Sequence, residues 1–186
     1  MFRSGRLGLS FFGTSRRLVH SGKIAGLDKE SFVLLATQYT PFMRDVLRPV
    51  VQSLESGAIV LSLPFKPELV GKSTPPACLH GGVVAAMFDH VAGFCAWSAL
   101  DSSRKTVSTI DLRVDYLLPA PCEEIFFDAV VVSKTNRLVR VDVQCWDNPR
   151  KKKIAIARGL FNIYDSKTDI SELVASYADE ATKKIG

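Results

Sequence analysis

The fold of this chain is decided by the stretch Cys78-Leu79-His80-Gly81-Gly82-Val83-Val84-Ala85-Ala86-Met87-Phe88-Asp89-His90-Val91-Ala92-Gly93. It opens with a His-Gly-Gly turn and continues as an almost unbroken apolar run to about residue 100, which predicts a helix buried on every side. Asp89 lies in the middle of this run. An uncompensated carboxylate in apolar surroundings costs at least about 2 kcal/mol. We therefore interpret Asp89 as a candidate functional residue.

The pattern changes to period two after this helix. Residues 109–116 alternate polar and apolar side chains, which predicts a half-buried antiparallel strand. The strands that follow are joined by short turns, so they cannot form a parallel sheet. Five strands are expected, over residues 57–65, 109–116, 124–133, 138–146 and 152–164. The sequence thus predicts an α+β fold in which a curved antiparallel sheet wraps around the long helix.

Further segments flank this unit. Helices are predicted over 27–38 and 168–184, whereas 42–56 could be helix or loop. Residues 66–79, rich in Pro and Gly, are expected to form a loop. The expected organisation is a leader (1–27), an N-terminal helical extension (28–56), the sheet-and-helix domain (57–165) and a C-terminal helix (166–186).

Charge is concentrated in the first residues. The formal net charge is +5, but from Asp28 onward the 19 acidic residues are matched by an equal number of Lys and Arg. The basic balance is therefore no evidence for a nucleic-acid partner. The Arg-rich, Ser-rich and acid-free segment 1–27 is typical of a mitochondrial transit peptide, which predicts the matrix as location; a disordered basic tail is the alternative.

Other site classes are disfavoured by composition. The four cysteines form no CxxC pair, which argues against a zinc centre and a disulfide framework, so no metal is expected. A membrane span at 81–100 would carry Asp89 and His90 at its centre, where an acid costs about 2.5 to 3.5 kcal/mol. No membrane span is therefore expected.

The motif resembles a known family. His80-Gly81-Gly82 with Asp89 nine residues after the His, and the strand Thr109-Ile110-Asp111-Leu112-Arg113-Val114-Asp115-Tyr116-Leu117-Leu118-Pro119-Ala120, resemble the hotdog-fold acyl-CoA thioesterases over residues 58–164. The branch is the one typified by the phenylacetate-pathway and 4-hydroxybenzoyl-CoA thioesterases. The resemblance implies an enzyme that hydrolyses acyl-CoA to free acid and CoA, without a cofactor besides the coenzyme A of its substrate. It also implies homodimers, often paired into tetramers.

The motif suits that chemistry. Gly81 and Gly82 would let a ligand approach the unpaired amides at a helix start, and an oxyanion donor there is worth about 3 to 4 kcal/mol. The resemblance assigns this role to the Gly81 amide and makes Asp89 base or nucleophile. Gly81 and Asp89 lie about 12 Å apart along a helix, which predicts that the site combines Gly81 of one chain with Asp89 of a second.

The remaining candidates have alternatives. His80 would either contact the ligand or order the turn, and Asp89 itself could be a structural acid at an interface. Thr109 is expected near the reacting water, or as an ordinary strand residue. Thr74 stands where the family often has an Asn, six residues before the His. Lys134 and Arg137 are candidate contacts for CoA phosphates, and the basic run 150–153 is another, unless it is a solvated turn.

Two other functions remain open. Thr74 in place of Asn suggests a hotdog domain that binds acyl-CoA or an acyl carrier without hydrolysis. The fold could also serve as an assembly subunit alone.

Overall fold

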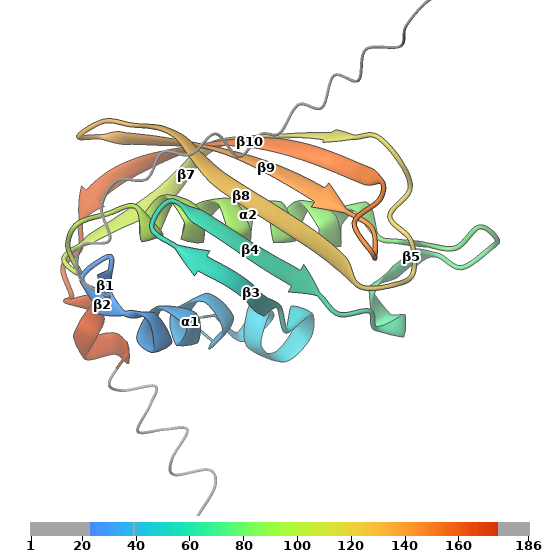
Figure 1. Ribbon diagram of the computed structural model, residues 1–186. Coiled ribbons are helices and arrows are strands. Elements are labelled where there is room, and N and C mark those ends of the chain that lie inside the picture. Colours follow the sequence, from blue (N-terminus) through green and yellow to red (C-terminus); the bar gives the residue numbers. More distant parts are fainter. Residues whose placement is uncertain (1–22, 39, 175–186) are drawn as a thin grey trace, which may run out of the picture.

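The computed structural model describes residues 23–38 and 40–174 (Figure 1). Most of the predicted leader and most of the predicted C-terminal helix lie outside these residues. The helices are α1 (Lys29–Gln38), a short π-helix η1 (Phe42–Leu47), a 3₁₀ turn η2 (Pro67–Leu69) and α2 (Gly81–Ser98). The strands are β1 (Lys23–Ile24), β2 (Leu27–Asp28), β3 (Val50–Glu55), β4 (Ala58–Leu63), β5 (Val70–Lys72), β6 (Cys78–Leu79), β7 (Lys105–Tyr116), β8 (Ile125–Lys134), β9 (Leu138–Trp146) and β10 (Lys153–Asp165).

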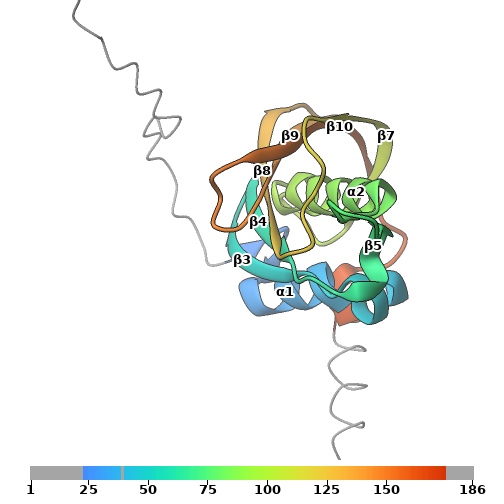
Figure 2. The ribbon, with the colours of Figure 1, turned by 90° about the vertical axis from the view of Figure 1, so that its right-hand side faces the viewer.

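The main layer is one antiparallel sheet with the strand order β3-β4-β8-β9-β10-β7. Figure 2 shows this sheet arching over α2, with α1 on the other side of that helix. The predicted α+β architecture, a curved antiparallel sheet around a long central helix, is confirmed. Two smaller ribbons, β1-β2 and β5-β6, lie outside the main sheet.

Helix α2 supplies the centre of the core. Met87, Phe88 and Val91 are fully buried, and the rings of Phe88 and Phe127 meet edge to face at 5.2 Å between centroids. The expectation that α2 is buried on every side is wrong along one stripe. Its members are small or acidic and are exposed or only partly buried: Gly82, Ala85, Ala86, Asp89 and Gly93. In a single chain the carboxylate of Asp89 is therefore exposed to solvent rather than buried.

The expectation of helix or loop over residues 42–56 agrees with η1 but is wrong for the last part of that segment. Val50–Glu55 is a strand that pairs with β4, so the sheet begins seven residues before the expected boundary at 57. Its alternation is broken by a register shift between Val51 and Ser53, and its side chains are mostly exposed. Val51 and Leu54 pack against the core, but the register shift puts them three residues apart, so β3 lacks the period-two signal on which sequence analysis depends.

Helix α1 packs under α2 through aromatic side chains. The ring of Phe32 lies 5.8 Å from that of Phe94 and 6.1 Å from that of Trp97. His90 of α2 contacts the carbonyl oxygen of Ala36 through Nε2 at 2.6 Å, which joins the two helices by a buried hydrogen bond. At the other end of the described chain, the C-terminal helix begins at Ile170, whose side chain is buried.

Strand β7 forms one edge of the sheet and contains a bulge. Thr109 pairs with Phe161 and Asp111 pairs with Leu160, so Ile110 is the extra residue. Val107 and Thr109 lie on the helix side before the bulge, whereas Leu112 and Val114 lie there after it. Strict alternation would place Thr109 on the outer face, with Asp111 and Arg113. The bulge is what turns the Thr109 hydroxyl toward α2.

Candidate active site

His80 builds the start of α2. It has extended backbone angles (φ −65°, ψ 129°), and its Nδ1 accepts a hydrogen bond of 2.9 Å from the Gly82 amide. Of the two roles considered for His80, this contact supports the one that orders the turn. Gly71 of β5 makes the arrangement possible, because a Cβ at position 71 would lie 2.6 Å from the Cα of His80.

The two glycine amides of the motif differ in availability. The Gly82 N–H is already bound by His80, so it is not available to a ligand. The Gly81 N–H has no acceptor among the described residues, as the first residue of a helix allows. It points from the positive end of the helix dipole, where negative charge is stabilised. Gly81 is therefore the one of the pair whose amide can polarise a carbonyl oxygen.

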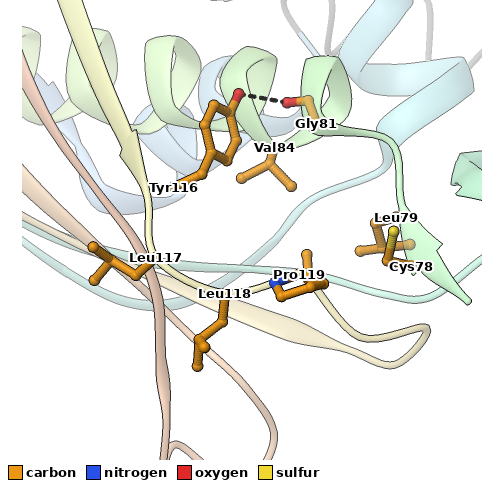
Figure 3. A pocket seen from close by; sticks show the side chains of 9 residues that line it. Cys78, Leu79, Gly81, Val84, Tyr116, Leu117, Leu118 and Pro119 are labelled. Carbon is orange, nitrogen blue, oxygen red and sulfur yellow. Dashed lines mark hydrogen bonds between the residues drawn. The ribbon is translucent and has the colours of Figure 1, made fainter. Parts of the chain in front are cut away.

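A cavity of about 370 Å³ opens beside Gly81 (Figure 3). Its walls are mostly apolar and come from the end of β7, the following loop, β6 and the first turn of α2. They comprise Cys78, Leu79, Gly81, Val84, Tyr116, Leu117, Leu118, Pro119 and Ala120. An apolar cleft of this kind beside an amide donor suits an acyl group attached to a polar head.

Tyr116 is a residue that sequence analysis did not single out. Its hydroxyl donates a hydrogen bond of 2.8 Å to the Gly81 carbonyl oxygen, and a Cβ at Gly81 would lie 3.8 Å from its ring. Figure 3 shows the phenol ring beside the first turn of α2, where it walls the cavity. The sequence signal that could have found Tyr116 is an aromatic side chain with a hydroxyl group at the end of β7.

Asp89 and Thr109 are brought together. The Thr109 hydroxyl donates to Asp89 Oδ1 at 2.8 Å, and both side chains are exposed. This contact holds one oxygen of the carboxylate in a fixed place on the open stripe of α2. The second oxygen is free to accept a proton or to attack a carbonyl carbon.

Gly81 and Asp89 of one chain do not form a joint site. Asp89 follows Gly81 by eight positions in α2, which corresponds to about 12 Å along the helix axis. That separation exceeds the reach of a hydrogen bond by several times. The Gly81 amide and the Asp89 carboxylate could therefore act on one ligand only if they came from different chains.

His90 is buried and faces α1. Burial, partly offset by the Ala36 carbonyl and by Asp89, lowers the pKa of His90 to about 4, so the ring is neutral near pH 7. Its buried hydrogen bond to α1 gives His90 a structural role.

Three of the predicted ligand contacts lie elsewhere. Thr74 is exposed in the loop between β5 and β6, which projects from the body in Figure 1, and it does not line the cavity. Lys134 Nζ donates to the Ala99 carbonyl oxygen at 2.5 Å, at the C-terminal end of α2. Arg137 follows in the same exposed hairpin. Within one chain these two cations lie at the opposite end of α2 from Gly81.

The thiols and carboxylates show no further centre. Among residues 23–38 and 40–174, no group of three or more His, Cys, Asp or Glu side chains is placed to hold a metal ion. Burial raises the pKa of Cys95 to about 12 and that of Cys145 still more, so both thiols are protonated at neutral pH. None of the helices in these residues has the length and hydropathy needed to cross a bilayer.

Comparisons with known proteins agree with this architecture. Residues 78–154 match the model of the thioesterase superfamily. A protein of Halobacterium salinarum that is named as an esterase is 29% identical to this chain over 119 residues. The match covers 61% of this chain and 79% of the Halobacterium protein. The chain is therefore similar to the thioesterase superfamily over residues 78–154, and its fold is the hotdog fold.

Solved structures show the same fold. A thioesterase family protein from Silicibacter pomeroyi superposes with a TM-score of 0.65 at 23% identity, covering 74% of this chain and 98% of that one. A Streptococcus mutans protein solved bound to acetyl CoA superposes with a TM-score of 0.58 at 15% identity, covering 70% of this chain and all of that one. These two likenesses concern the fold.

Proposed function

We propose that this protein is an acyl-CoA thioesterase, which hydrolyses an acyl-CoA thioester to the free acid and CoA. The proposal rests on the Gly81 N–H at the start of α2, which has no acceptor among the described residues and faces an apolar cavity. A thioester oxygen at this amide would be polarised, and the oxyanion formed by attack on the carbonyl carbon would be stabilised. The acyl group would lie against the walls of the cavity.

Asp89 supplies the second part of the proposed reaction. It either takes a proton from a water that attacks the thioester carbonyl, or it attacks that carbon itself to give an acyl-enzyme anhydride that water then hydrolyses. In both routes the electron pair of the broken C–S bond leaves with the sulfur of CoA. Thr109 orients the carboxylate by its hydrogen bond at 2.8 Å.

The active unit of this proposal is a homodimer, in which Asp89 of one protomer faces Gly81 of the other. Three features of the single chain support it. The stripe of small residues around Asp89 is open, and β7 is an unpaired edge on which Ile110 is 54% exposed. At the cavity, Tyr116, Leu117 and Leu118 are each about half exposed, which a second chain would reduce. Pairing of dimers into tetramers is part of the same proposal.

The location proposed for this reaction is the mitochondrial matrix. It rests on the Arg-rich, Ser-rich and acid-free composition of residues 1–27. Import of a fusion of these residues to a reporter protein would support it, and a cytosolic reporter would contradict it.

The test is release of free thiol from short, long and aromatic acyl-CoAs by the protein and by its Asp89→Asn variant. Turnover that collapses in the variant, while light scattering gives an unchanged oligomer, supports the thioesterase. Turnover that survives in Asp89→Asn contradicts the assignment of the carboxylate. Thermal stabilisation by acyl-CoA without turnover in either protein would favour a binding domain, the alternative suggested by Thr74.

A further inference from the structure

A basic turn lies next to the cavity, between β9 and β10. The loop after Trp146 carries Arg150, Lys151, Lys152 and Lys153. The next residue, Ile154, accepts hydrogen bonds of 2.9 Å at its carbonyl oxygen from the amides of both Leu117 and Leu118. Leu117 and Leu118 line the cavity beside Gly81. The basic turn therefore continues directly from the wall of the proposed acyl site.

The turn holds a fixed shape through Asp147. The Asp147 Oδ1 atom accepts from the backbone amides of Lys151 at 2.8 Å and Lys152 at 2.7 Å, and the Asp147 amide donates to the Lys152 carbonyl oxygen at 3.0 Å. Both lysine side chains are exposed. A backbone fixed in this way presents the two ammonium groups from one place, which lowers the ordering cost of binding an anion.

The charges of the turn are only partly compensated. Arg150 pairs with Asp128 and lies over the ring of Phe126, and Lys153 lies 5.0 Å from the centre of the Trp146 ring. No carboxylate within the described part of the chain forms an ion pair with Lys151 or Lys152. These two ammonium groups are available to an external anion.

The hairpin between β8 and β9 lies far from the cavity. Its Lys134 is engaged by the Ala99 carbonyl, at the end of α2 where the helix dipole is negative. Figure 1 shows the β8-β9 and β9-β10 hairpins at opposite ends of the molecule, with the latter at the end where α2 begins. The position of the cations in the fold, rather than their number, distinguishes the two hairpins.

We infer that Lys151 and Lys152 bind the phosphate groups of the coenzyme A part of the substrate. The inference rests on the proposed thioesterase function and deepens it, because it assigns the polar end of the ligand to a particular turn. With the thioester carbonyl at Gly81 and the acyl chain in the cavity, the pantetheine arm of the substrate would run outward past Leu117 and Leu118. Phosphates at its end would meet ammonium groups that act as point charges.

The test compares the full chain with a Lys151→Gln/Lys152→Gln double variant and, as matched control, a Lys134→Gln/Arg137→Gln double variant. Each removes two positive charges from an exposed hairpin. Two substrates carry the same acyl group, one on CoA and one on pantetheine, which has no phosphate. Binding of free CoA is measured in parallel by calorimetry, so that a readout exists without turnover.

The expected result is a KM for acyl-CoA and a Kd for CoA raised about 3- to 10-fold in Lys151→Gln/Lys152→Gln, as two exposed charge contacts allow. The kcat and the KM for acyl-pantetheine stay unchanged, and so does the control variant. The inference is overturned if Lys151→Gln/Lys152→Gln binds CoA as tightly as the parent protein, or if its KM rises equally for both substrates. It is also overturned if only the control variant loses CoA affinity. If no thioester is cleaved by any protein, the proposed function fails, while the CoA affinities still decide the role of the turn.

Discussion

Replacing Gly81 by Pro would remove the proposed oxyanion donor and leave the backbone in place. Gly81 is the first residue of α2, a position where Pro is favoured because its missing N–H has no partner in the helix. The residue before a Pro must be extended, and His80 already has φ −65° and ψ 129°. A Cβ at position 81 would lie 3.8 Å from the Tyr116 ring, which is an ordinary contact.

The expected effect of Gly81→Pro is confined to the chemical step. Loss of one oxyanion donor lowers kcat by about 10² to 10³, which corresponds to about 3 to 4 kcal/mol of transition-state stabilisation. Stability should not fall, because Pro reduces the entropy of the unfolded chain by about 0.4 to 1 kcal/mol where its φ fits. The assay is thiol release at saturating acyl-CoA, with Tm measured on the same samples.

Gly81→Ala is the matched control. It adds a Cβ in the same space but keeps the N–H, so its kcat should stay close to that of the parent protein. The reasoning is refuted if Gly81→Pro keeps its Tm and also turns over at the rate of Gly81→Ala. The amide would then have no part in the reaction.

Three further predictions follow from the same geometry. Mixing equal amounts of Gly81→Pro and Asp89→Asn chains should restore about a quarter of parental activity, because half of the dimers are then mixed and each mixed dimer has one of its two composite sites intact. Absence of any recovery would contradict sites shared between chains. Thr109→Val should lower kcat about 10-fold by releasing the carboxylate, whereas Thr109→Ser should not, and equal rates would show that the 2.8 Å contact is irrelevant. Burial lowers the pKa of His90 to about 4 from 6.5, so as the pH falls the unfolded state takes up a proton on this ring before the folded state does. The free energy of unfolding should therefore fall by up to about 3 kcal/mol between pH 7 and 4. Urea titrations of His90→Gln should lack this part of the pH dependence.

The central helix and most of the sheet could be predicted because their signals are strong and local. An apolar run that opens with His-Gly-Gly predicts α2, and four strands with period-two or continuous apolar patterns lie within a few residues of their predicted ends. Strand β3 was missed because its side chains are mostly exposed and its register shifts. Its identity as a strand comes from pairing with β4, which is a property of the tertiary structure.

The candidate site was predicted unevenly for a similar reason. Residue type and the resemblance to hotdog thioesterases single out Gly81 and Asp89, and the structure places Gly81 at the start of α2 and Asp89 on its open stripe. The contact of Tyr116 with Gly81, and the engagement of Gly82 by His80, depend on how β7 and β5 lie against α2. Lys134 looked suitable as a turn cation, but the direction in which β8 runs takes it to the far end of the helix.

The bulge at Ile110 divides β7 into two halves of opposite phase. Odd-numbered residues face α2 before it, and even-numbered residues face α2 after it. Deleting Ile110 would leave Thr109 directly before Asp111, opposite the adjacent residues Leu160 and Phe161, so β7 would follow one regular alternation with the Thr109 hydroxyl still beside Asp89. The inner face of β7 therefore depends on the pairing of each half with β10 rather than on the length of the strand, and Ile110 is the position at which the chain can lose a residue without losing a functional contact.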